Sequence, residues 1–100
     1  PFPTISLVIK NRKWILGHIS LRVEKKTAHM FHLIIDEKFR RKGLAKKLIA
    51  EIESYCLSLE KTITLNVSKK NTKALNLYNN LGYIIKDEKK KQKNVKMQKF

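Results

Sequence analysis

Apolar positions alternate along the first third of the chain. The alternation covers residues 5–9, 14–23 and 29–35, and short polar stretches separate these segments. Successive side chains of a β-strand point to opposite faces, so each segment predicts a strand with one buried face. The polar residues 11–13 and 24–27 suit tight turns. This part of the sequence therefore predicts three consecutive strands arranged as a meander.

The spacing of apolar residues becomes helical after Gly43. Apolar residues recur at helical intervals over residues 44–59 and mark one wide face. Alternation returns over residues 62–67, which predicts a fourth strand. Asn71 is a favourable N-cap for a second helix through Leu81. The glycine that follows, at position 82, suits the C′ position that ends a helix.

The end of the chain predicts two more strands, over residues 83–85 and 95–100, with a lysine-rich turn between them. The order of elements is then β-β-β-α-β-α-β-β. The strand–helix–strand unit over residues 29–67 predicts a parallel, right-handed connection in an otherwise antiparallel sheet. We expect an α+β fold with a mixed sheet, formed by residues 1–100 as a single domain, because a chain of this length accommodates one core.

Composition excludes several classes of protein. Hydrophobic residues make up 42% and charged residues 31% of the chain. No apolar run approaches the roughly 20 residues of a membrane helix, so we expect no membrane partner. Residues 1–6 lack the layout of a signal peptide. Cys56 is the single cysteine, which excludes an internal disulfide framework and favours a reducing, cytoplasmic location. His18 has no carboxylate at a ligand spacing, so no metal site is expected.

The charge balance is unusual, with 23 Lys and Arg against 8 Asp and Glu, a formal net charge of +15. Such a charge attracts polyanions, which include nucleic acid, an anionic membrane surface and a phosphorylated cofactor. The lysines are scattered along the chain, and aromatic residues are not interleaved with them as in a stacking surface. We therefore expect only weak, non-specific binding of nucleic acid. Cationic polyamines are disfavoured as substrates because the surface repels them.

The segment Arg40-Arg41-Lys42-Gly43-Leu44-Ala45 lies where a strand leads into a helix. The first turn of a helix has N–H groups without internal partners and carries the positive end of the dipole. Gly43 lets a phosphate approach these donors, and three cations flank it. The segment predicts a pyrophosphate site. Alternatively, it is a tight turn that needs one glycine, with its cations in solvent. It is not a P-loop, because no G-K-[ST] follows.

Four segments in this order resemble the GNAT (Gcn5-related N-acetyltransferase) superfamily. Arg40-x-x-Gly43-x-Ala45 is similar to the family's acetyl-CoA pyrophosphate motif, [RQ]-x-x-G-x-[GA]. The second motif is matched by Asn71-x-x-Ala74-x-x-Leu77-Tyr78 with Leu81-Gly82-Tyr83. Two strand motifs are matched by Ile15-Leu16-Gly17-His18-Ile19 and Leu33-Ile34-Ile35-Asp36.

The resemblance implies an enzyme that transfers acetyl from acetyl-CoA to an amine acceptor by direct attack. A bulged strand at Leu33, Ile34 and Ile35 would hold the pantetheine arm, and Asn71 with Ala74 would contact the cofactor. Tyr78 would stand near the thioester sulfur as general acid. The pyrophosphate would be bound by Arg40, Arg41, Lys42, Gly43, Leu44, Ala45 and Lys46. Alternatively, Asn71 is only an N-cap and Tyr78 is a core residue.

The sequence also departs from the family. The family's domains usually begin with another strand and two helices, and the given sequence begins at the second strand. We therefore expect either an open acceptor groove or a wall supplied by a partner or by a second copy, as in a homodimer. Many members carry a glutamate as general base where this chain has His29. That histidine and the basic loop resemble protein N-terminal acetyltransferases, although lysines replace their tyrosine-rich segment at residues 89–93.

His29 and His32 differ by three in sequence number and so are expected to face opposite sides of a strand, which leaves at most one of them facing the site. Alternatively, His29 is a surface residue.

The acceptor must be a neutral amine. An α-amine with a pKa of about 8 is neutral to roughly one part in ten at pH 7, but a lysine with a pKa of about 10.4 only to a few parts in ten thousand. We therefore expect a peptide α-amine or a small amine of low pKa as acceptor. Two other functions fit the sequence. One is a non-catalytic CoA-binding remnant that regulates or pairs with another protein, and the other is a basic nucleic-acid-binding domain.

Overall fold

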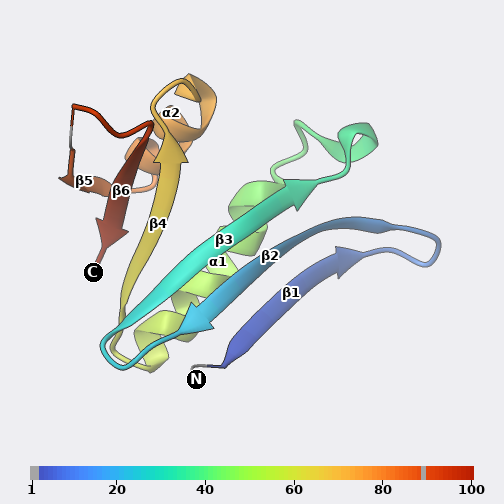
Figure 1. Cartoon of the computed structure of the whole chain (residues 1–100). Helices are drawn as coiled ribbons and strands as arrows, with labels where there is room; N and C mark the ends of the chain where they lie inside the picture. The colour runs from blue at the N-terminus through green and yellow to red at the C-terminus, as the bar shows by residue number, and fades with distance from the viewer. Residues whose placement is uncertain (1–2, 89) are drawn as a thin grey trace.

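The computed structural model describes residues 3–88 and 90–100 and contains a six-stranded mixed sheet with two α-helices (Figure 1). The strands lie in the order β1-β2-β3-β4-β6-β5 across the sheet. This architecture confirms the α+β class and the predicted order of strands and helices. The strands are β1 (Thr4–Lys10), β2 (Ile15–Val23), β3 (Thr27–Ile35), β4 (Thr62–Ser68), β5 (Ile84–Asp87) and β6 (Asn94–Lys99).

The strand boundaries differ from the predicted ones by one or two residues. β3 begins at Thr27 because the turn before it is closed by a 2.9 Å hydrogen bond from the Glu24 N–H to the Thr27 carbonyl. β5 begins at Ile84, since the N–H of Tyr83 donates to the carbonyl of Tyr78 at 2.9 Å and belongs to the end of a helix. Backbone hydrogen bonds at the turns therefore set these limits.

The sheet is antiparallel except between β3 and β4. Strands β1, β2 and β3 form the predicted meander, and β6 pairs antiparallel with both β4 and β5. The parallel pairing of β3 with β4 covers only Thr27–His29 and Thr62–Thr64. Beyond these residues the two strands diverge toward their carboxyl ends (Figure 1). The sheet is therefore forked on the side from which both helical connections leave.

Strand β3 contains a bulge next to this fork. Its register with β2 shifts between the pairs His18↔Ile34 and Ser20↔Phe31, so β3 has one more residue there than β2. His32 adopts φ 51°, in the left-handed region. The bulge includes His32 and Leu33, whereas the family resemblance placed it at residues 33–35. Residues 34 and 35 are already paired with β2, which is why the irregularity comes earlier.

Both helices pack against one face of the sheet. α1 (Leu44–Ser58) buries Leu48, Ile49, Ile52 and Cys56, and α2 (Thr72–Asn80) buries Tyr78. These side chains form one core cluster with inward-facing residues of the strands. Hydrophobic burial on this face is the main source of stability. Figure 1 shows α1 behind the strands, and over the described residues no helix covers the opposite face.

The predicted ends of the second helix are confirmed. Asn71 is the N-cap of α2, and its Oδ1 accepts a 3.1 Å hydrogen bond from the N–H of Ala74. Gly82 adopts φ 95°, the left-handed conformation expected of a residue that follows a helix. The loop between β3 and α1 contains a short 3₁₀ turn, η1 (Glu37–Phe39), which Asp36 caps by accepting from the N–H of Lys38 at 2.9 Å.

Candidate functional site

Gly43 forms the amino-terminal cap of α1 and leaves the first turn of that helix open. Its φ is 75°, no side chain caps the helix, and the first internal bond runs from the Lys47 N–H to the Gly43 carbonyl at 3.1 Å. The N–H groups of residues 44–46 therefore have no partner within the helix. A Cβ at position 43 would meet nothing within 4 Å. The donors and the positive end of the helix dipole face open space, as an anion site requires.

A cavity of about 650 Å³ lies against this helix end. The end of β3, the basic loop and the first turns of both helices form its walls. It brings together almost all residues predicted to bind the cofactor: Leu33, Ile34, Ile35, Arg40, Arg41, Gly43, Leu44, Ala45, Lys46, Asn71 and Ala74. Lys42 is not among the lining residues, and its Nζ lies 5.8 Å from the ring centroid of Phe39. The loop, the strand end and the second helix thus enclose one space.

A smaller cavity of about 310 Å³ adjoins the first at the fork between β3 and β4. Leu33, Asn71, Ala74 and Leu77 line both cavities. The smaller one also contains Tyr78 in its wall. A path therefore leads from the open turn of α1 along β3 to this tyrosine.

Tyr78 belongs both to the core and to the wall of this cavity. The residue is 8% exposed, and its ring packs edge-on against Tyr83 with centroids 5.4 Å apart and an angle of 73°. Burial raises the pKa of Tyr78, so its hydroxyl stays protonated at neutral pH. Tyr78 lines the smaller cavity while its ring also belongs to the core.

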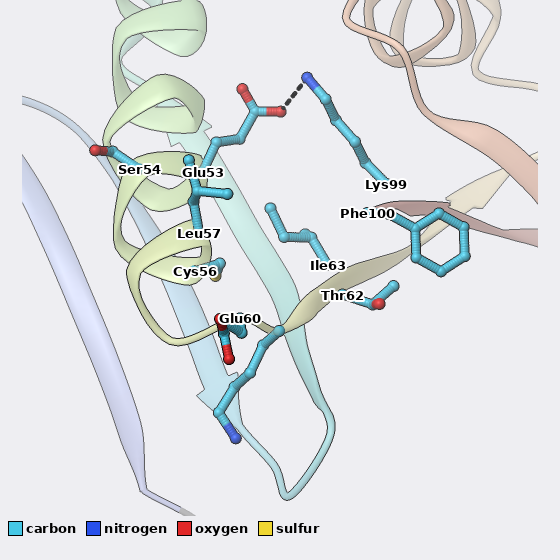
Figure 2. A pocket seen from close by; sticks show the side chains of 10 residues that line it. Glu53, Ser54, Cys56, Leu57, Glu60, Thr62, Ile63, Lys99 and Phe100 are labelled. Carbon is cyan, nitrogen blue, oxygen red and sulfur yellow. Dashed lines mark ion pairs between the residues drawn. The ribbon is translucent and has the colours of Figure 1, made fainter.

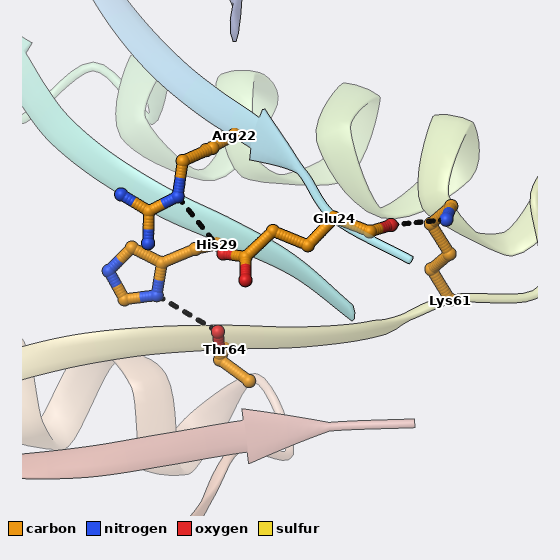
Figure 3. A network of polar contacts seen from close by, with 5 residues as sticks. All are labelled: Arg22, Glu24, His29, Lys61 and Thr64. Atoms are coloured by element: carbon orange, nitrogen blue, oxygen red, sulfur yellow. Dashed lines mark hydrogen bonds and ion pairs between the residues drawn. The ribbon is translucent and has the colours of Figure 1, made fainter. Parts of the chain in front are cut away.

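His29 lies on the face of the sheet opposite the helices and lines neither cavity. Its Nδ1 is 2.9 Å from Thr64 Oγ1, and Arg22 is its neighbour on β2 (Figure 3). Burial, and then the charge of Arg22, lowers the pKa of His29. The Glu24 carboxylate has the opposite effect on the pKa of His29 and is paired with Arg22 Nε at 3.0 Å. His29 is the last β3 residue paired with β4, so it stands at the base of the fork.

The cavities also contain residues that were not predicted to bind the cofactor or to act in catalysis. Phe39, Lys73 and Leu77 line the larger cavity, and His32, Asn66 and Ser68 line the smaller one. Leu77 belongs to the second matched motif, and its position three residues after Ala74 places both side chains on one face of α2. Asn66 and Ser68 line a cavity because β4 separates from β3, and the residues of β4 carry no local signal of that separation.

A third cavity, of about 670 Å³, lies at the other end of α1 (Figure 2). The carboxyl end of α1, the start of β4 and the end of β6 enclose this cavity. Much of its lining comes from Cys56, Leu57, Ile63 and Phe100. None of the predicted site residues borders it.

Two further findings concern metals and membranes. Within residues 3–88 and 90–100, no group of three or more His, Cys, Asp or Glu side chains is placed to hold a metal ion. No helix in the same part of the chain is long and apolar enough to cross a membrane.

The forked mixed sheet and the basic glycine turn that opens a helix beside the fork define an acyl-CoA N-acyltransferase fold. A family model described as an acetyltransferase (GNAT) domain matches residues 4–100. The chain therefore belongs to the GNAT family, as the sequence motifs predicted.

Individual relatives agree with this assignment. The catalytic subunit NAA20 of the N-terminal acetyltransferase B complex from Arabidopsis thaliana is 32% identical over 74 residues, which are 72% of this chain and 42% of the relative. PaiA N-acetyltransferase from Thermoplasma acidophilum, solved in complex with coenzyme A, has a TM-score of 0.86 at 20% identity. That match covers 96% of this chain and 60% of PaiA.

The ribosomal-protein-S18-alanine N-acetyltransferase from Escherichia coli has a TM-score of 0.84 at 17% identity. The match covers 95% of this chain and 67% of the Escherichia coli enzyme. At such identities the structures show a shared fold. The chain spans less than two thirds of the NAA20 and PaiA chains.

Proposed function

We propose that the chain binds acetyl-CoA and transfers the acetyl group to an amine by direct attack on the thioester. One observation carries the proposal: the path of two adjoining cavities from the open turn of α1, along the end of β3, to Tyr78. A phosphate-bearing head, a thin arm and a reactive end, in that order, are the parts of an acyl-CoA molecule.

The chain's own groups suit each part of that ligand. The N–H groups of residues 43–46 are the donors for the pyrophosphate, and Arg41 and Lys46 add positive charge at the same cavity. Arg40 Nε donates to the Ile35 carbonyl at 3.1 Å and so fixes the loop to the end of β3. Asn71 faces β3 across the cavity, and because its Oδ1 caps α2, its amide N–H groups remain for the pantetheine arm.

The proposed reaction moves two protons. The amine nitrogen bonds to the carbonyl carbon of the thioester, and the carbon–sulfur bond breaks as the tetrahedral intermediate collapses. His29, or a chain of waters leading to it, takes the proton from the amine. Its lowered pKa keeps the ring neutral and able to accept a proton at pH 7. Tyr78, which stays protonated, gives its proton to the departing thiolate.

The proposed acceptor is the α-amine of a protein or peptide. An α-amine is neutral at pH 7 far more often than a lysine side chain, so it needs less help from a base. The relatives point the same way, since one is the catalytic subunit of an N-terminal acetyltransferase complex and another acts on the alanine of ribosomal protein S18. The net charge of +15 disfavours polycationic amines.

A second candidate function is CoA binding without catalysis. The position of His29 outside both cavities favours it, because the proposed base then needs water to reach the acceptor. A mass-spectrometric acetylation screen over peptides with free α-amines, N-blocked lysine peptides and small amines separates the two functions. Acetylation confined to α-amines supports transfer to that acceptor. CoA binding without any product supports the second candidate, and a chain that binds no CoA contradicts both.

A further inference from the structure

Lys99 connects three elements of the structure and lies outside the CoA path, the two adjoining cavities proposed to hold CoA. From β6, its Nζ reaches Glu53 Oε2 on α1 at 2.9 Å and donates to the carbonyl of Leu81 at 2.7 Å (Figure 2 shows the ion pair). The same Nζ lies 5.7 Å from the ring centroid of Tyr83. An ammonium group has three donors and no acceptor, so one side chain can satisfy all three neighbours.

The carbonyl of Leu81 belongs to the end of α2. The last carbonyls of a helix have no internal partner and carry the negative end of the dipole, which a cation stabilises. α2 has only nine residues, a length that is marginal without outside support. Lys99 supplies such support, and its Cε would lie 3.5 Å from a Cβ at Gly82, so its side chain runs over the turn that ends the helix.

This turn also positions Tyr78. After Gly82 the chain reverses, and the N–H of Tyr83 donates to the carbonyl of Tyr78 at 2.9 Å. The ring of Tyr83, which is 1% exposed, then packs edge-on against that of Tyr78. Two sets of contacts therefore connect the Lys99 ammonium to Tyr78, one through the helix end and one through the Tyr83 ring.

We propose that Lys99, held by Glu53, is a positioning residue for Tyr78: it fixes the end of α2 and the Tyr83 ring, and so places the Tyr78 hydroxyl at the fork of the sheet. The inference rests on the proposed function, in which that hydroxyl protonates the thiolate. It assigns no part of CoA binding to Lys99, because Lys99 lines neither cavity of the CoA path.

The test compares Lys99→Met, Lys99→Arg and Glu53→Gln with the wild-type chain. Lys91→Met, in the exposed turn before β6, is the matched control for loss of a lysine. Lys99→Met should lower kcat about tenfold, since small misplacements of a catalytic group have effects of that size or larger. KM for acetyl-CoA should stay within about twofold of wild type, because the interaction matters only in the transition state. Lys99→Arg should restore most of the rate.

The NMR signal of Tyr78 in chains with ¹³C-labelled tyrosine gives a measurement that does not depend on turnover. A single Tyr78 signal in the wild type should broaden or divide in Lys99→Met and Glu53→Gln, and should stay unchanged in Lys91→Met. Glu53→Gln preserves shape, so it decides the matter if Lys99→Met does not fold.

An unchanged Tyr78 signal and kcat in the folded variants would overturn the inference, as would a loss of CoA affinity equal to the loss of rate. Should the wild type transfer no acetyl group at all, the proposed function fails, and the Tyr78 signal alone decides whether Lys99 positions that side chain.

Discussion

Replacing Gly43 by glutamate should abolish CoA binding while leaving the fold in place. A Cβ at this position meets nothing within 4 Å, so the side chain itself causes no clash. The cost comes from the backbone, whose φ of 75° lies in the left-handed region. For a residue with a Cβ that conformation costs about 1–2 kcal/mol. The variant should therefore fold with a lower Tm and carry a carboxylate where the pyrophosphate is proposed to bind.

The size of the effect follows from linkage. If the proposed site binds CoA, a hundredfold excess of CoA over Kd should stabilise the wild-type chain by about 2.7 kcal/mol, which should raise the Tm of a domain of this size by about 10–20 °C. If the substitution weakens binding a hundredfold, the same CoA concentration supplies only about 0.4 kcal/mol, or about 2–3 °C. Differential scanning fluorimetry with and without CoA distinguishes these values.

Gly82→Glu is the matched control, because Gly82 also has a positive φ, of 95°, and the change in charge is the same. Its Cβ would lie 3.5 Å from Lys99 Cε, an ordinary contact, and the residue lines neither cavity of the CoA path. This variant should lose Tm in the absence of CoA yet keep the full CoA-induced rise. A normal CoA-induced rise in Gly43→Glu, or an equal loss of it in both variants, would refute the assignment of the phosphate site.

Three further substitutions test other parts of the structure. Tyr78→Phe should lower kcat by a factor of about 10²–10⁴, because it removes the proposed general acid, and should leave the Kd of CoA nearly unchanged. An unchanged kcat would show that Tyr78 serves only in core packing. Burial, and then the charge of Arg22, lowers the pKa of His29 below its unfolded value of 6.5, so the folded chain favours the neutral ring. This contribution to the free energy of unfolding is fully present above pH 6.5 and is lost as the pH falls through the lowered pKa. Thermal unfolding of His29→Gln should accordingly depend less on pH below about 6.5 than that of wild type, and equal pH dependence would contradict this. Gly17→Ala should lower the free energy of unfolding in urea by about 1–3 kcal/mol, since the new Cβ would lie 2.8 Å from the backbone oxygen of Ile34. A variant as stable as wild type would contradict this close approach of β2 and β3.

Features of the chain that depend on short-range interactions were predictable from the sequence. Asn71 caps α2 because its side chain reaches an N–H three residues ahead, and Gly82 ends the same helix because glycine adopts a positive φ at little cost. Gly43 opens α1 for a similar reason. The phosphate site proposed from the loop consists of such local features. Its residues consequently lie together in the structure much as the sequence indicated.

The fork of the sheet was not predictable in the same way. β3 and β4 pair over only three residues each and then diverge, and no residue of either strand signals where the pairing stops. The divergence creates the smaller cavity and brings Asn66 and Ser68 to its wall. It also determines which candidate residues can cooperate, since Tyr78 lies at the fork on the helical side and His29 at its base on the opposite face.

The bulge at His32 interrupts the rule that every second residue of a strand points to the same face. The rule holds before the bulge, where Phe31 lies opposite Ser20 and on the same face as His29. Beyond it, Ile34 lies opposite His18 and therefore on that same face, although Phe31 and Ile34 are three residues apart. The extra residue turns Leu33 toward the helices and into both cavities. A side chain on β3 can thus be assigned to the CoA path only once the bulge is located, and its location is set by pairing with β2 rather than by the residues of β3 themselves.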